Sequence, residues 1–228
     1  QLWICTTIGL NKFDRRKNCF ERFINNPSDS NSLCNNLLYK IIEDSFGNYW
    51  IGTADGLARY SPVSKRFKTF LHSSEESGSI SDDRIRSIYQ DSKGSLWVGT
   101  FGGGLNKFNY QDNTFTPYTT ENGLANNVVY EIIEDDSSNL WLSTNNGLSM
   151  FNTKSKTFRN YSIQDGLQDN EFNGGASYKS LDGEMFFGGV NGINSFHVEE
   201  VTKNNSTIPS LVITEFRILN EKVTPISH

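Results

Sequence analysis

Hydrophobic and polar residues form short alternating runs along most of the chain, and turn-forming residues separate these runs. Phe67-Lys68-Thr69-Phe70 is one such run, and Ile41-Ile42-Glu43-Asp44 is another that ends in an acidic turn. Gly, Asn, Asp and Ser lie between the runs, and helical periodicity is absent throughout. The pattern predicts short β-strands and an all-β fold.

The four tryptophans mark a repeated unit. Trp3, Trp50, Trp97 and Trp141 are separated by 47, 47 and 44 residues, and Phe186 takes the same place in a weaker fifth copy 45 residues later. A period of this length is typical of a repeat architecture. Because a binding residue has no reason to recur in every unit, we interpret these five aromatic side chains as packing between repeats.

Every copy contains the same order of short runs. The tryptophan run is followed by Gly-Leu or Gly-Ile, then by an aromatic run, then by a strand-like segment that ends in an acidic turn. Four strands in each period are typical of a β-propeller blade, whose antiparallel sheet packs against its neighbours. We predict a partial propeller of about four full blades and a first blade without its inner strand. The predicted blades are 1–30, 31–77, 78–121, 122–165 and 166–197.

The repeat resembles a known family. The run from Val129 to Leu148 reads Val-x-x-Ile-x-Glu-Asp-x-x-x-x-Leu-Trp-Leu-x-Thr-x-x-Gly-Leu, which is similar to the two-component regulator propeller repeat. Residues 38–57 and 85–105 fit the same pattern, and the resemblance covers residues 2 to about 197. It implies the extracytoplasmic sensor region of a hybrid two-component system, a class common in gut Bacteroidetes.

The end of the chain agrees with this resemblance. Leu211 to Asn220 alternates like a strand and resembles the opening of the Tyr-Tyr-Tyr domain. In that family this immunoglobulin-like β-sandwich joins the last propeller to a transmembrane helix, beyond which a histidine kinase core follows. We therefore predict a linker over 198–210 and the first strand of the sandwich within 211–228. Contact with the membrane is expected only through a further C-terminal part.

Composition excludes several classes of protein. The 228 residues are 36% hydrophobic and 13% aromatic, which is typical of a folded soluble chain, and the formal charge of −5 provides no basic surface for nucleic acid. Three scattered histidines and three cysteines without a Cys-x-x-Cys pair predict no metal site and no cofactor. Because Gln1-Leu2-Trp3-Ile4 reads as the middle of a strand, without the layout of a signal peptide, we expect a piece of a longer chain.

Two motifs with catalytic associations have simpler explanations. The run from Gly99 to Gly104 is followed by Leu105-Asn106 rather than the Lys-Ser/Thr of a phosphate-binding loop. Asp82-Asp83 aligns with Asn35-Asn36 and Asn126-Asn127, and an acid that is replaced by amide in other repeats fits a turn better than general acid catalysis. No Ser-His-Asp or Cys-His set is recognisable, so we expect no enzymatic activity.

Ligand recognition is expected where the repeats differ. Recurring residues form the scaffold of a repeat protein, whereas variable loop positions can contact a specific ligand. In propeller topology the loops between second and third strands share a face with the connections between blades. Aromatic, arginine and amide groups at these places suit a sugar. The candidate binding residues are Tyr39, Arg86, Phe101, Tyr130, Asn145 and Asn173.

Three functional hypotheses follow. The first is a periplasmic sensing module of a hybrid sensor histidine kinase, which recognises a glycan-derived oligosaccharide, acts as a homodimer and controls polysaccharide-utilisation genes. The sugar ligand is implied by the resemblance. The second is a propeller that binds no small molecule and has a structural or dimerisation role. The third is a propeller-fold lyase or glycosidase, which the missing catalytic set disfavours.

Overall fold

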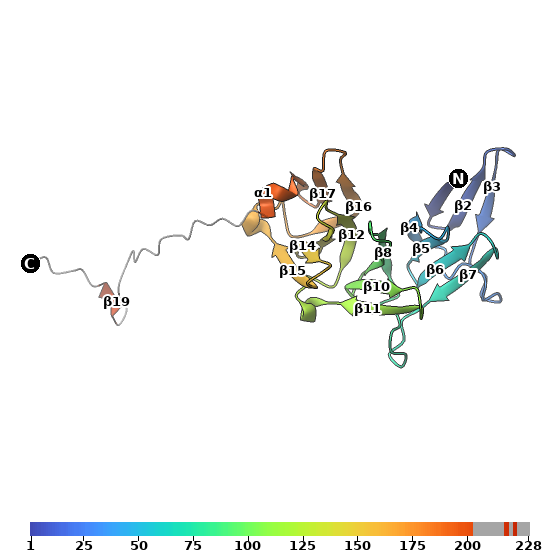
Figure 1. Cartoon of the computed structure of the whole chain (residues 1–228), viewed down its shortest axis with the longest axis horizontal. Helices are drawn as coiled ribbons and strands as arrows, with labels where there is room; N and C mark the ends of the chain where they lie inside the picture. The colour runs from blue at the N-terminus through green and yellow to red at the C-terminus, as the bar shows by residue number, and fades with distance from the viewer. Residues whose placement is uncertain (203–216, 219–220, 223–228) are drawn as a thin grey trace, which may run out of the picture.

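The computed structural model describes residues 1–202, 217–218 and 221–222 and is nearly all β-structure, as predicted. Five antiparallel sheets follow one another along the chain, and Figure 1 shows them side by side in a fan from β2 and β3 to β16 and β17. The first blade contains β1 (Leu2–Thr6), β2 (Gly9–Asp14) and β3 (Cys19–Phe23). The second contains β4 (Leu38–Glu43), β5 (Tyr49–Thr53), β6 (Leu57–Ser61) and β7 (Arg66–Phe70).

The other three sheets repeat this order. The third blade contains β8 (Ile85–Gln90), β9 (Leu96–Thr100), β10 (Leu105–Asn109) and β11 (Thr114–Tyr118). The fourth contains β12 (Val129–Glu134), β13 (Asn139–Thr144), β14 (Gly147–Asn152) and β15 (Thr157–Tyr161). The fifth contains β16 (Phe172–Lys179), β17 (Met185–Gly189) and β18 (Gly192–Phe196). Each strand pairs with the next one in the chain, so every blade is a simple meander.

The number of complete blades differs from the prediction. Among the described residues, three blades have four strands and the first and the fifth have three, which gives three full blades where we predicted about four. The first blade lacks the inner strand, as predicted. Its first strand, β1, carries Trp3 and therefore corresponds to the second strand of the complete blades. In the fifth blade, helix α1 (Val198–Thr202) follows β18 in place of a fourth strand. This copy also lacks the Phe-rich run that forms the outer strand elsewhere.

Short helical segments appear where none was expected. Thr120–Asn122 and Ile163–Asp165 form single 3₁₀ turns between an outer strand and the next inner strand. Each turn starts at a hydroxyl cap and stops at a glycine with positive φ, a conformation that favours glycine. Helix α1 occupies the first five residues of the predicted linker.

The predicted sandwich strand lies mostly outside the described residues. Within it, β19 (Arg217–Ile218) pairs with β20 (Glu221–Lys222) as a two-stranded antiparallel ribbon. The rest of 203–228 is not described.

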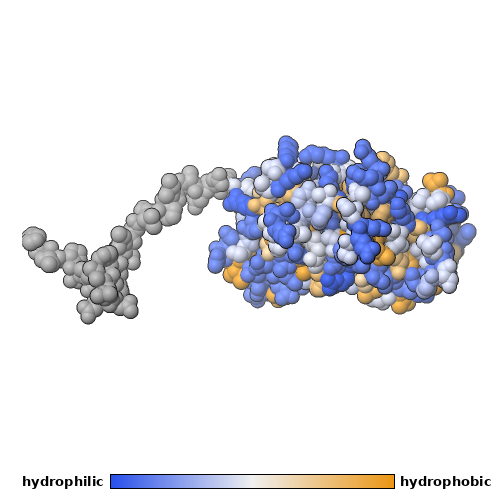
Figure 2. Space-filling view, turned by 90° about the horizontal axis from the view of Figure 1, so that it is seen from below, coloured by the Kyte–Doolittle hydropathy of each residue, from blue (hydrophilic) through white to orange (hydrophobic). Residues whose placement is uncertain are grey.

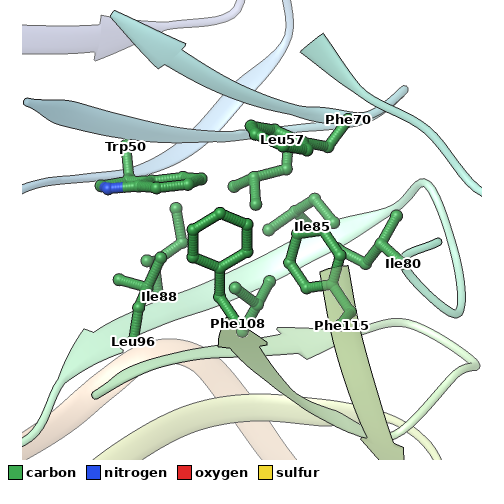
Figure 3. Packing of buried hydrophobic residues seen from close by; sticks show 10 residues of the cluster. Trp50, Leu57, Phe70, Ile80, Ile85, Ile88, Leu96, Phe108 and Phe115 are labelled. Carbon is green, nitrogen blue, oxygen red and sulfur yellow. The ribbon is translucent and has the colours of Figure 1, made fainter. Parts of the chain in front are cut away.

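Aromatic side chains fill the space between blades. Trp50 of the second blade is fully buried and packs with Ile88 and Phe108 of the third (Figure 3). Trp97 and Trp141 occupy the same position between later blades. Truncating a buried tryptophan of this kind to alanine costs about 3 to 5 kcal/mol, so these residues tie neighbouring sheets together.

The first and last members of the aromatic series have different surroundings. Trp3 is half-buried against Tyr49 and Tyr60 of the second blade, at ring centroid distances of 4.8 and 5.7 Å. Phe186 is also half-buried and lies 6.4 Å from the Tyr178 ring of its own blade.

An aspartate secures the hairpin of three of the four tryptophans, and the Trp3 indole nitrogen is buried without a hydrogen-bond partner. Asp44, Asp91 and Asp135 are buried, and each accepts the indole N–H of the tryptophan six residues later, at 2.7, 2.8 and 3.0 Å. The same carboxylates also accept backbone N–H groups of the turn. The recurrence of acid and tryptophan therefore has one structural cause.

The surface is mostly hydrophilic with separate hydrophobic patches, as Figure 2 shows for one face. None of the helices in the described ranges is long and apolar enough to cross a membrane.

Candidate functional site: side chains of the bulged face

Three of the candidate residues lie in the same kind of backbone irregularity, a β-bulge at the start of the inner strand of their blade. Leu38 pairs with Thr53 and Lys40 pairs with Gly52, which leaves Tyr39 between them without a partner across the ladder. Arg86 and Tyr130 are left unpaired in the same way at the start of β8 and β12. Such a β-bulge adds one residue to a strand and changes the direction of its side chain.

The bulges lie on the face that carries the connections between blades. The loop after β5 donates a hydrogen bond from Ala54 N to Leu37 O at 3.0 Å, and the loop after β9 donates one from Phe101 N to Arg84 O at 2.9 Å. Both acceptors lie just before an inner strand. The second-to-third strand loops therefore share a face with the bulges, which we call the bulged face.

Arg86 lies between two aromatic rings on the bulged face. Its guanidinium carbon is 4.2 Å from the ring centroid of Tyr39 and 4.6 Å from that of Phe101. Cation–π contacts at this distance attract the guanidinium and fix its orientation. The contact joins the second and third blades, since Tyr39 belongs to β4 and Phe101 follows β9.

The row continues into the fourth blade. Phe101 and Tyr130 are in edge contact, with ring centroids 6.2 Å apart, and Phe101 also forms an isolated backbone bridge with Val128. The Tyr130 hydroxyl donates a 2.7 Å hydrogen bond to Oδ1 of Asn145. Five of the six candidates are thus joined in one row, which we call the recognition row: Tyr39, Arg86, Phe101, Tyr130 and Asn145.

Asn173 stands apart from the recognition row. It is exposed, and none of the hydrogen bonds or ring contacts found among the described residues joins it to the other five. Its strand contains a larger irregularity, because Phe172 pairs with Gly189 and Ser177 with Phe187, which leaves residues 173–176 opposite Gly188 alone. A Cβ added at the neighbouring Gly174 would lie 3.7 Å from Cδ1 of Tyr130, so this part of the strand passes close to the row.

A second arginine, Arg84, borders the row, and Asp82 neutralises its charge. Arg84 lies 5.2 Å from the Phe101 ring centroid, and Asp82 accepts hydrogen bonds from its Nε and Nη2 at 3.0 and 2.7 Å. Burial raises the pKa of Asp82, but the hydrogen bonds from Arg84 outweigh burial, so the pKa lies below its ordinary value.

The paired acidic and amide residues serve the turns. Oδ1 of Asp82 accepts the N–H of Arg84, and the Asp83 carboxylate accepts the N–H of His72 at 2.6 Å. The Asp83 carbonyl accepts from Gly56 of the preceding blade at 2.7 Å. These bonds tie each connection to the blade before it.

The glycine-rich run of the third blade is a strand-to-strand loop. Gly104 has φ +77° and donates its N–H to Asn127 O, while a Cβ at Gly103 would overlap Ser81. Strand β10 follows directly, so the run has no helix N-terminus at which to hold a phosphate.

The sequence analysis missed one cluster beside the bulges. Glu131, on β12, is buried and forms an ion pair with Lys40 of β4 at 3.0 Å. Its carboxylate also accepts hydrogen bonds from the Gly175 N–H at 2.7 Å and from the Ser177 hydroxyl at 3.3 Å. It thereby joins the second, fourth and fifth blades. The signal was available, because Lys40, Ser87 and Glu131 occupy equivalent places and differ in charge.

The recognition row offers two aromatic faces, a phenol, an amide and a guanidinium. These groups can stack on an apolar ring face and exchange hydrogen bonds with hydroxyls. No cluster of three potential metal ligands is present in the part of the chain that the structure describes.

Comparisons with known proteins give the repeat its family. Residues 32–55, 79–102 and 123–146 match the family model described as two component regulator propeller. Over 115 residues, 50% of this chain, the sequence is 33% identical to Histidine kinase P4 of Formosa agariphila, of which the match spans 8%.

Solved structures show the same fold. The extracellular domain assigned to a hybrid two component system of B. thetaiotaomicron matches with a TM-score of 0.79 and 30% identity, over 99% of this chain and 31% of that one. A virginiamycin B lyase from Staphylococcus aureus has a TM-score of 0.61 at 14% identity, covering 86% of this chain and 65% of that one, which shows the fold alone. The three segments that match the two component regulator propeller model lie in three successive blades, so the similarity to that family falls on the repeated unit of the propeller.

Proposed function

We propose that this region is the periplasmic sensor propeller of a hybrid two-component histidine kinase and that it binds an oligosaccharide on the bulged face. The observation that carries the proposal is the continuous recognition row across three blades, built on residues that the bulges remove from strand pairing. The relatives support the setting, since one is a histidine kinase and another is an extracellular domain.

The chemistry of the row favours a sugar over other small molecules. Tyr39 and Phe101 present aromatic rings that can stack on the C–H face of a pyranose, and Tyr130 and Asn145 can exchange hydrogen bonds with its hydroxyls. The binding residues come from three blades, so a ligand of two or more sugar units would contact several of them at once. Such a ligand would stabilise one packing of the blades.

In this proposal the region performs no chemistry. Binding changes how the propeller packs within a homodimer of the parent protein, and that change passes across the membrane to the kinase and controls genes for polysaccharide use. A ligand can shift such an equilibrium only by binding one state more tightly than the other.

Titration calorimetry against a panel of glycan-derived oligosaccharides tests the proposal. We expect at least one member of the panel to bind, and Tyr39→Ala to weaken its binding about tenfold or more through loss of stacking. Phe46→Ala is the matched control, because Phe46 is an exposed aromatic residue of the β4–β5 turn, at the opposite end of the same blade.

Three results would contradict the proposal. Absence of binding across the panel would favour a structural or dimerisation role for these blades. Equal weakening by Tyr39→Ala and Phe46→Ala would remove the bulged face as the site. Release of a shortened or unsaturated product from the panel would indicate an enzyme.

A further inference from the structure

The charge of the recognition row points to the charge of its ligand. Arg86 is the member of the row that carries a full charge, and an arginine side chain stays protonated at any physiological pH. Its Nε is buried without a hydrogen-bond partner, and no hydrogen bond or ion pair within the described ranges involves its guanidinium. The rings of Tyr39 and Phe101 stabilise the cation but offer no oxygen to its N–H donors.

The neighbouring cations differ in this respect. Arg84 is held by two hydrogen bonds to Asp82, and Lys40 forms the 3.0 Å ion pair with Glu131. Both are therefore neutralised locally. Arg86 provides the unneutralised positive charge at this place in a chain whose formal charge is −5.

The stacking also suits Arg86 for a particular kind of partner. The two ring contacts hold the guanidinium in place, and the Arg86 side chain as a whole is only partly buried, so a ligand can approach it. A guanidinium edge presents parallel N–H donors that match the oxygens of a carboxylate or a sulfate ester. Hydroxyl groups of a neutral sugar accept single hydrogen bonds and cannot offset the charge.

We propose that Arg86 receives an acidic group of the ligand, so that the bulged face recognises an oligosaccharide carrying a carboxylate or a sulfate ester. This inference rests on the proposed function and deepens it. At physiological ionic strength the overall negative charge of the chain is screened within about 8 Å, so it does not oppose an anion that contacts Arg86 directly.

The test compares acidic oligosaccharides with their neutral counterparts. The probes are uronate-containing and sulfated oligosaccharides of two to four sugar units, together with the same sugars after carboxyl reduction or desulfation. We expect the chain of residues 1–228 to bind an acidic probe about 10- to 100-fold more tightly than its neutral counterpart. Separate uronate and sulfate probes identify which acidic group is preferred.

Variants assign the preference to one side chain. Arg86→Gln should abolish the preference by weakening acidic probes, and Arg86→Lys should retain part of it, because the charge remains without the planar edge. Arg66→Gln is the control, because Arg66 is an exposed arginine of the outer strand β7, and it should preserve the preference. Circular dichroism and the thermal midpoint show whether each variant is folded, and Arg86→Lys keeps the test informative if Arg86→Gln fails to fold.

The outcomes separate the two proposals. Equal binding of acidic and neutral probes would overturn the inference about Arg86 and leave the oligosaccharide site standing. An acidic preference that Arg66→Gln removes as fully as Arg86→Gln would also overturn it. If no probe of either kind binds, the proposed function fails, and the acidic ligand fails with it.

Discussion

Asp82, Asn35 and Asn126 occupy the same position in three successive blades, and the side-chain oxygen of each accepts a backbone N–H two residues later at 2.8 Å. An amide oxygen does this as well as a carboxylate. Asp82→Asn should therefore leave the free energy of unfolding within about 0.5 kcal/mol of wild type, whereas Asp82→Ala should lower it by about 1 kcal/mol. Urea unfolding measures both, and an equal cost for the two variants would show that the negative charge matters.

The three cysteines should differ in reactivity. Burial raises the pKa of the Cys5 thiol to about 11 and raises the pKa of Cys34 as well, whereas Cys19 is exposed on β3. Because the thiolate is the reactive form, iodoacetamide at about pH 8 should label Cys19 first. Mass spectrometry of the digested protein follows each site. If Cys5 were labelled as fast as Cys19, the packing of Cys5 on β1 against the second blade would be contradicted.

The hairpin between the first two strands of each blade depends on its aspartate. In the third blade Asp91 is buried and accepts the N–H groups of Lys93, Ser95 and the Trp97 indole at 3.0, 2.8 and 2.8 Å. Asp91→Ala leaves these donors unpaired and should lower the free energy of unfolding by about 2 to 4 kcal/mol.

Asp112→Ala is the control for this hairpin. Asp112 belongs to the same blade and also accepts a backbone N–H, from Thr114, but it lies on the surface. Its loss should cost less than about 1 kcal/mol in the same denaturant titration. Similar costs for the two variants would mean that the buried bond from Trp97 contributes little.

The strands were predictable from sequence, whereas the bulges were not. Tryptophan spacing and the Gly-Leu steps give the order of the strands, because each repeat folds mostly through contacts with its own neighbours. A bulge depends on which residues pair across two strands, and alternation alone does not reveal the extra residue at Tyr39 or Arg86. Among the described residues the fifth blade has no outer strand, which agrees with the absence of the aromatic run from this copy, although we predicted about four full blades.

Glu131 should couple blades that are distant in the chain. Its ion pair with Lys40 crosses 91 residues of sequence, and its carboxylate is almost fully buried. A double-mutant cycle of Glu131→Gln and Lys40→Met should give a coupling energy of about 1 to 3 kcal/mol in the free energy of unfolding. Additive effects, with a coupling energy near zero, would show that the second and fourth blades are stable independently.

The candidate site was only partly predictable for a related reason. Topology and variation among repeats gave six candidate residues, and the structure joins five of them in one row. That they bind a ligand stays a prediction. The contacts between them were not predictable, since Tyr39 of the second blade meets Arg86 and Phe101 of the third only when the two blades pack side by side. Lys40 and Glu131 were missed although equivalent positions differ in charge, because the sequence does not show that β4 and β12 lie close enough for the two side chains to pair.

Amide protection in the presence of a bound oligosaccharide tests the central claim most directly, because it locates the site without any substitution. With the tightest-binding probe of the panel, hydrogen exchange should slow in 37–41, 84–87, 99–104, 128–131 and 144–146, the segments that form the bulged face. The turns at 44–48, 91–95 and 135–139, at the opposite ends of the same blades, should be unchanged. Protection confined to those turns, or spread equally over both ends, would contradict the account.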